Sequence, residues 1–164
     1  MLGRLGSGLA LASIAMLLLA GCAPEEPTTE EVRPQVEEAF DGFQELVAEQ
    51  LSTRQIDASG LEEYATPEVA QTWSSDLQRL LESGYTSSGR PTLTNVVVLG
   101  ESSGVLTTQL CTDGSAIETI DAEGNTIAPA ELVAWDAEFA LTEGGDRYLL
   151  ASLEPIAEDE VCVR

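Results

Sequence analysis

Apolar residues recur every three or four positions after Pro34, while most acidic residues lie off that stripe. This is the spacing of one buried face on an amphipathic helix. Pro34 itself is typical of a first helical turn, because proline lacks the N–H that is unsatisfied there. The sequence therefore predicts a first helix from Pro34 onward that packs on a core through Val36, Phe40, Phe43, Val47 and Leu51.

Two further helices are predicted before residue 85. Ser59 followed by Glu62 has the spacing of a capping box, which predicts a short second helix through Tyr64. The dipeptide at 66–67, Thr-Pro, is typical of a helix start, and Gly84 is placed to end the third helix. The expected buried face of that third helix comprises Val69, Trp73, Leu77, Leu80 and Leu81.

Beyond Pro91 the pattern changes to short β-type runs that are separated by turn residues. Along residues 133–141, apolar and mostly polar residues alternate, which predicts one face toward a core and one toward solvent. Helices first and strands afterwards predict an α+β fold, with N-terminal helices packed on a curved antiparallel sheet. The predicted strands cover residues 92–99, 105–111, a weaker hairpin within 116–127, 133–141 and 148–154.

A separate apolar run occupies residues 9–20 and follows a single positive charge at Arg4, which is the layout of a secretory signal. The run is shorter than the roughly 20 apolar residues of a transmembrane helix. It ends in Leu-Ala-Gly-Cys at residues 19–22. This ending resembles the lipobox of bacterial lipoproteins, and the resemblance implies cleavage between Gly21 and Cys22 and attachment of diacylglycerol to Cys22. Acylation of the new amino group, as with palmitate, is also implied. An uncleaved anchor, or an ordinary signal with an incidental cysteine, is the alternative.

This interpretation divides the chain into three parts. Residues 1–21 form the signal peptide, and residues 22–33 form an acidic tether, since they hold two prolines and four glutamates but little to bury. Residues 34–164 are enough for one domain with a single core. The expected location is extracytoplasmic, on a bacterial cell membrane, of an actinobacterial type, through the lipid on Cys22.

The composition excludes several classes of function. The chain has 29 acidic and 7 basic residues, all arginine, and a formal net charge of −22. A nucleic-acid partner is not expected, because neutralising phosphates takes clusters of Lys and Arg. The absence of histidine removes the usual general base and the commonest zinc ligand, and without lysine there is no Schiff-base nucleophile. We expect no cofactor and no metal.

Two cysteines remain beyond the lipobox. Cys111 and Cys162 are an even pair in an exported chain, and an oxidising compartment favours one disulfide between them. Two buried free thiols or a redox pair are the alternatives.

The order of elements resembles the cone-shaped NTF2-like (SnoaL-like) fold over residues 34–164, and the layout is similar to small actinobacterial lipoproteins of that type. In such proteins a cysteine followed by Asp in a mid-sheet strand can pair with one near the C-terminus. Cys-Thr-Asp at 111–113 and Val-Cys at 161–162 occupy comparable places here. A cystatin-like helix on a sheet is the competing fold, but it would have to explain three helices. The resemblance implies a pocket between sheet and helices.

Candidate site residues are few. Trp73 and Trp135 could wall an apolar ligand pocket, although core packing is the alternative for both. Asp113, followed by glycine, and Asp136, in an alternating strand, are expected in a turn and on the solvated face. Residues 121–132 have the glycine of a calcium loop in the wrong place, so a hairpin turn is favoured.

The expected function is therefore non-enzymatic: an envelope lipoprotein that binds a partner protein or a small apolar ligand. One alternative is a pocket enzyme of the isomerase or dehydratase type, which would need a buried Asp or Glu with a raised pKa as general base. The tyrosines available to stand beside that base are Tyr64, Tyr85 and Tyr148. The other is an accessory subunit of an envelope complex, which predicts a large exposed apolar patch.

Overall fold

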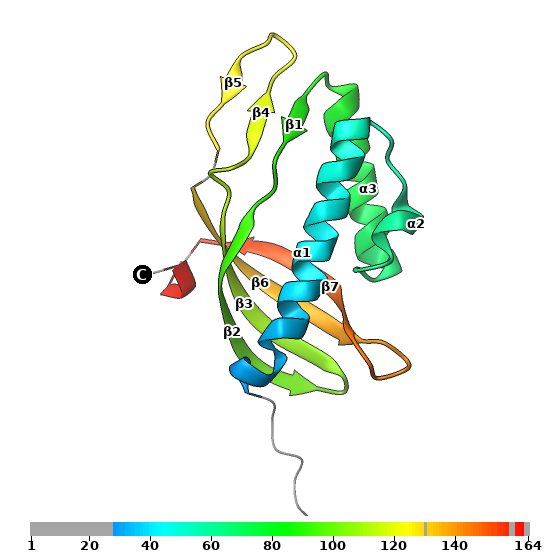
Figure 1. Cartoon of the computed structure of the whole chain (residues 1–164), viewed down its shortest axis with the longest axis vertical. Helices are drawn as coiled ribbons and strands as arrows, with labels where there is room; N and C mark the ends of the chain where they lie inside the picture. The colour runs from blue at the N-terminus through cyan, green and yellow to red at the C-terminus, as the bar shows by residue number, and fades with distance from the viewer. Residues whose placement is uncertain (1–27, 130, 158–159, 163–164) are drawn as a thin grey trace, which may run out of the picture.

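Three helices open the part of the chain that this computed structural model describes, residues 28–129, 131–157 and 160–162. The long first helix crosses one face of an antiparallel sheet, and the third lies beside its second half (Figure 1). The helices are α1 (Thr29–Thr53), α2 (Ala58–Leu61) and α3 (Pro67–Glu82).

Helix α1 begins five residues earlier than the sequence predicts, so the predicted tether is wrong over residues 29–33. The start is fixed by Thr28, whose backbone N–H donates to the Glu31 carboxylate at 2.9 Å in a capping box. Val32 is 5% exposed and belongs to the core, which adds hydrophobic stabilisation to this extra turn. Pro34 consequently lies inside the helix rather than at its start. The tether residues before position 28, together with the lipobox, lie outside the described residues.

The other two helices differ in how well their ends were predicted. The cap of α2 is Asp57, whose carboxylate accepts from the backbone N–H of Ser59 at 3.0 Å. The predicted cap at Ser59 and end at Tyr64 are therefore wrong. Helix α3 starts at Pro67 as predicted, and Gly84 follows its end with a φ of +85°, a conformation that glycine adopts without strain.

The strands form two sheets. A four-stranded antiparallel sheet has the order β2-β3-β6-β7, and a small three-stranded sheet has the order β1-β4-β5. Figure 1 shows the small sheet extending away from the large one, alongside the second half of α1. The short strand β1 was not predicted. The bounds are β1 (Thr86–Ser88), β2 (Thr92–Ser102), β3 (Val105–Asp113), β4 (Glu118–Ile120), β5 (Thr126–Ile127), β6 (Leu132–Leu141) and β7 (Tyr148–Ile156).

The core lies between the helices and one face of the large sheet. Phe40 and Phe43 of α1 are at most 1% exposed and belong to the same cluster as Leu110 of β3 and Phe139 of β6. Register shifts in β2 and β7 mark bulges, which bend a strand and help the sheet to curve. This architecture confirms the predicted α+β class and fits an NTF2-like cone, whereas a cystatin-like fold would leave two helices unexplained.

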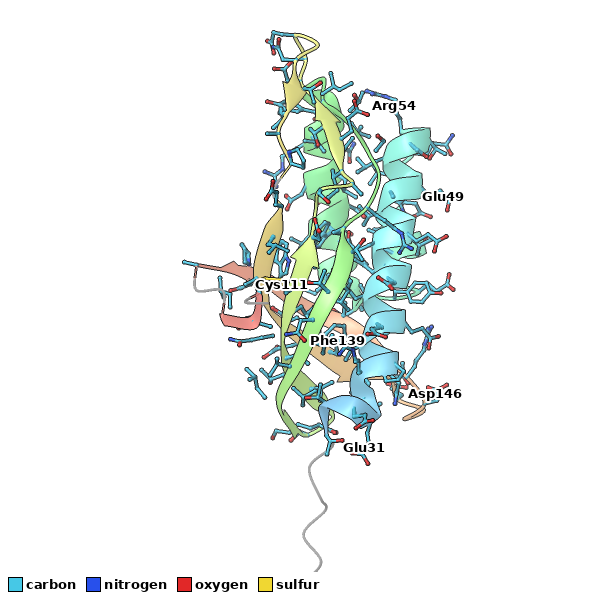
Figure 2. All side chains as sticks on the ribbon, turned by 60° about the vertical axis from the view of Figure 1, so that its left-hand side comes forward. Glu31, Glu49, Arg54, Cys111, Phe139 and Asp146 are labelled. Carbon is cyan, nitrogen blue, oxygen red and sulfur yellow. A yellow bond between two sulfur atoms is a disulfide. The ribbon has the colours of Figure 1, made fainter. Side chains whose placement is uncertain are left out.

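The opposite face of the sheet carries a small second cluster around a disulfide. Cys111 and Cys162 are bonded, with an S–S distance of 2.04 Å, which confirms the predicted pair. Cys162 belongs to a short 3-10 helix, η1 (Glu160–Cys162), which packs on Cys111 and Ala134. Figure 2 shows Cys111 on the side of the sheet away from α1. The outer face of β6 is therefore partly covered rather than wholly solvated.

Candidate functional site

A pocket of about 410 Å³ lies beside the second half of α1, where the small sheet meets the helices. Its volume falls within the roughly 300–1,000 Å³ that small-molecule sites occupy. Most of the lining is aliphatic or aromatic. The lining includes Gln44, Val47, Ala48, Leu51, Trp73, Leu77, Arg90, Thr112, Val133 and Trp135.

The pocket exists because two layers diverge at one end of the fold. Helix α1 supplies Val47, Ala48 and Leu51 to one wall at helical spacing, and Leu77 of α3 extends that wall. The opposite wall comes from the small sheet and from the ends of β3 and β6. Because the small sheet is separate from the large one, its strands stand across from the helices without filling the space between them.

Trp73 enters the pocket wall from α3. Its ring packs edge-on against Phe43, with a centroid distance of 5.2 Å and an interplanar angle of 90°. Such aromatic pairs stabilise a fold by more than the hydrophobic burial of their surface area alone. Phe43 is fully buried, whereas Trp73 is half-buried, so the pair connects the rigid core to the pocket wall.

Trp135 enters the wall from β6. Its indole N–H donates to the hydroxyl of Thr112 at 2.9 Å, and that hydroxyl donates to the backbone carbonyl of Val133 at 3.4 Å. The one polar group of the indole is thus satisfied within the sheet. Both predicted tryptophans therefore line the same pocket, and both also pack against the core, so the two interpretations of them hold together.

Among the residues that the structure describes, Arg90 is the only ionisable one in the lining. Its guanidinium forms a long ion pair with Asp41 of α1, with Nη1 and Oδ1 3.8 Å apart. Burial raises the pKa of Asp41 above its ordinary value, Arg90 opposes the rise, and Glu37 and Glu45 add to it. The sequence pattern does not single out Arg90 as a site residue, although the Gly-Arg-Pro turn at 89–91 marks its position.

The carboxylates of the described residues stay outside the pocket. None of them is among the buried polar groups, and none lines the cavity. The backbone N–H of Ser115 donates to Asp113 at 2.9 Å, which places that carboxylate in the predicted turn, and Asp136 is exposed beside Gln109. Asp121 accepts from the Asn125 N–H at 2.7 Å within the β4–β5 hairpin, as predicted. The predicted positions of Asp113, Asp136 and the 121–125 turn are therefore confirmed.

The tyrosines also lie outside the pocket lining. Tyr64 stacks over Gly42 of α1, where a Cβ would overlap its ring. Burial, and to a smaller extent the charge of Glu101, raises the pKa of Tyr148. Neither of these tyrosines nor Tyr85 belongs to the pocket lining.

Over the described ranges, no group of His, Cys, Asp and Glu side chains could hold a metal ion. Within those same ranges, no helix has the length and apolar character needed to cross a membrane.

Comparison with known proteins bears on the fold alone. No protein-family model matches the chain, and no curated protein matches it in sequence. The crystal structure of the intermembrane space region of the chloroplast protein ARC6 superposes with a TM-score of 0.55 and 12% identity, covering 76% of this chain and 96% of that one. An NTF2-like protein of unknown function from Exiguobacterium sp. 255-15 superposes with a TM-score of 0.39 and 10% identity, over 73% and 99% of the two chains. The second superposition is too loose to assign a fold.

Proposed function

We propose that this protein is a lipid-anchored, extracytoplasmic binding protein whose domain holds a small apolar ligand between Trp73 and Trp135. The observation that carries the proposal is the concave apolar pocket that both tryptophans line. Small-molecule sites combine apolar and aromatic walls with a few polar groups, and Gln44, Thr112 and Arg90 are such groups here. Without a carboxylate in the lining, the pocket is suited to binding rather than to acid–base catalysis.

The location rests on separate observations. A disulfide persists in oxidising compartments, and the Cys111–Cys162 bond supports export from the cytoplasm. The lipobox-like residues 19–22 supply the anchor in this proposal. One acyl chain binds a membrane only marginally, whereas two or three hold a protein stably.

A small ligand is favoured over a protein partner by the distribution of exposed apolar residues. Five large ones are exposed among the described residues, and they are spread over three strands, with two at opposite ends of β6. They are Val97, Leu99, Ile127, Leu132 and Leu141. No observation specifically favours an accessory subunit of an envelope complex.

Filling the pocket is expected to weaken binding strongly without unfolding the protein. Ala48→Phe puts a ring into the wall opposite the small sheet, so decan-1-ol should bind at least tenfold more weakly. Both tryptophans of the chain line the pocket, so their fluorescence reports binding directly. Gln35→Phe adds the same ring at an exposed position of the same helix and should leave the affinity unchanged. Equal affinity in the wild type and Ala48→Phe would contradict the proposed site.

The anchor is tested by Cys22→Ala in the full chain, expressed in a bacterium that processes lipoproteins. Because alanine has no thiol to receive diacylglycerol, we expect the precursor to lose its lipid and to stay unprocessed at Gly21. Metabolic labelling with a palmitate analogue and membrane fractionation measure this. Undiminished labelling of the variant would reject the lipoprotein assignment.

A further inference from the structure

We propose that the ligand is an anionic amphiphile, an aliphatic monocarboxylate whose tail fills the pocket and whose carboxylate binds Arg90. This inference rests on the proposed binding function and adds the chemical class of the ligand. It follows from the place of a single positive charge in a wall that is otherwise neutral.

The guanidinium of Arg90 has hydrogen-bonding capacity to spare. Its contact with Asp41, at 3.8 Å, is longer than a hydrogen bond, and its side chain is 47% exposed. Arginine has five N–H donors in a planar fork that matches a carboxylate in a bidentate pair. A ligand carboxylate at the pocket mouth can therefore make the short hydrogen bonds that Asp41 does not make.

The backbone holds Arg90 at this place. Gly89 has a φ of +80°, and a Cβ there would overlap the carbonyl oxygen of Ala116, so the chain runs tightly against the segment before β4. Pro91 follows, and a proline restricts the preceding residue to extended conformations. The side chain of Arg90 thus projects from a constrained segment rather than from a free loop.

The surrounding charge sets the selectivity. Glu37, Asp41 and Glu45 follow one another at intervals of one helical turn on α1. The formal net charge of the whole chain is −22, so a polyanion would be repelled. Charges beyond the Debye length of about 8 Å are screened at physiological salt, whereas a carboxylate in contact with Arg90 is not. A ligand with a single carboxylate on an apolar tail is repelled little by the distant charges and can still contact Arg90. A cationic amphiphile would instead be repelled by the guanidinium, which is the one charged group in the described part of the wall.

The test compares decanoate with decan-1-ol at pH 8, where the carboxyl group is ionised, by tryptophan fluorescence titration. The protein is the mature chain, residues 22–164, with Cys22→Ser to keep it free of lipid. Its buried clusters lie between Val32 and Cys162, so they are retained. Arg90→Gln should weaken decanoate about tenfold and decan-1-ol by a clearly smaller factor of about two to three, because only the carboxylate loses a charge-assisted pair. Asp41→Asn should strengthen decanoate roughly threefold, because it frees the guanidinium and removes a nearby negative charge.

Arg79→Gln and Asp76→Asn are the matched controls, since they make the same charge changes at an ion pair on the exposed face of α3. Both should leave the two affinities unchanged. If decan-1-ol binds but decanoate responds to neither Arg90→Gln nor Asp41→Asn, the ligand class is wrong while the pocket stands. If neither compound binds the wild type, the proposed binding function itself fails. Near-ultraviolet circular dichroism checks that each variant is folded.

Discussion

Replacing Cys111 and Cys162 together by alanine is expected to lower the free energy of unfolding by about 4 kcal/mol. The disulfide spans a sequence separation of 51 residues, and opening so long a loop restores much conformational freedom to the unfolded chain. In the folded state the bond ties η1 to β3 across the outer face of the sheet. Urea unfolding of both proteins, followed by tryptophan fluorescence, measures the difference.

This loss of stability should leave the pocket intact. Cys111 lies on the face of the sheet away from α1 (Figure 2), whereas residues of α1 and α3 line the pocket on the other side. At low temperature the double variant should therefore bind decan-1-ol within twofold of the wild type. The control is wild-type protein that has been reduced under denaturing conditions and then refolded. It lacks the disulfide but keeps the cysteine side chains, so it separates loss of the bond from the change to alanine. A stability change below about 1 kcal/mol would contradict the chain-entropy account.

Phe43→Ala is expected to cost a comparable amount, about 4 kcal/mol, and in addition to weaken ligand binding. Phe43 is fully buried, so truncation loses hydrophobic burial and leaves a cavity. It also removes the edge-on contact that supports Trp73 in the pocket wall, so we expect the affinity for decan-1-ol to fall about fivefold. Urea unfolding and fluorescence titration measure the two effects.

Phe139→Ala is the matched control, because Phe139 is equally buried in β6 but, unlike Phe43, has no edge-on ring contact with Trp73 among the described residues. It should lose about as much stability and keep the affinity. Equal loss of affinity in both variants would show that the effect comes from general loosening and not from Trp73. If either alanine variant fails to fold, Phe43→Leu and Phe139→Leu allow the same comparison at a smaller cost.

The helices and strands were predictable because burial imposes a period on the sequence. The stripe from Val36 to Leu51 and the alternation along β6 both appear in the structure, and the α+β class follows from their order. The ends of elements were less predictable. A proline at position 34 favoured a start there, yet the capping box at Thr28 and the burial of Val32 stabilise an earlier turn.

The candidate site was predictable only in part. Aromatic residues are common in cores and in ligand pockets, so the sequence could nominate Trp73 and Trp135 without deciding between the two environments. The role of Arg90 depends on residues far away in the chain. The strand before it is only three residues long, and its partner β4 lies beyond the whole of β2 and β3. No local pattern encodes that pairing.

The sequence by itself determined what depends on residue type and short-range spacing: the fold class and the lack of histidine and lysine. It also predicted the pairing of the two spare cysteines, which the structure confirms, and the lipobox at Cys22, which stays a prediction. The tertiary structure alone decided what depends on distance in space. It brings both tryptophans to one cavity, keeps the carboxylates out of it, and places Arg90 against Asp41. The physical reason is that periodicity records which face of an element is buried, whereas a pocket forms where two buried faces, from distant parts of the chain, fail to meet.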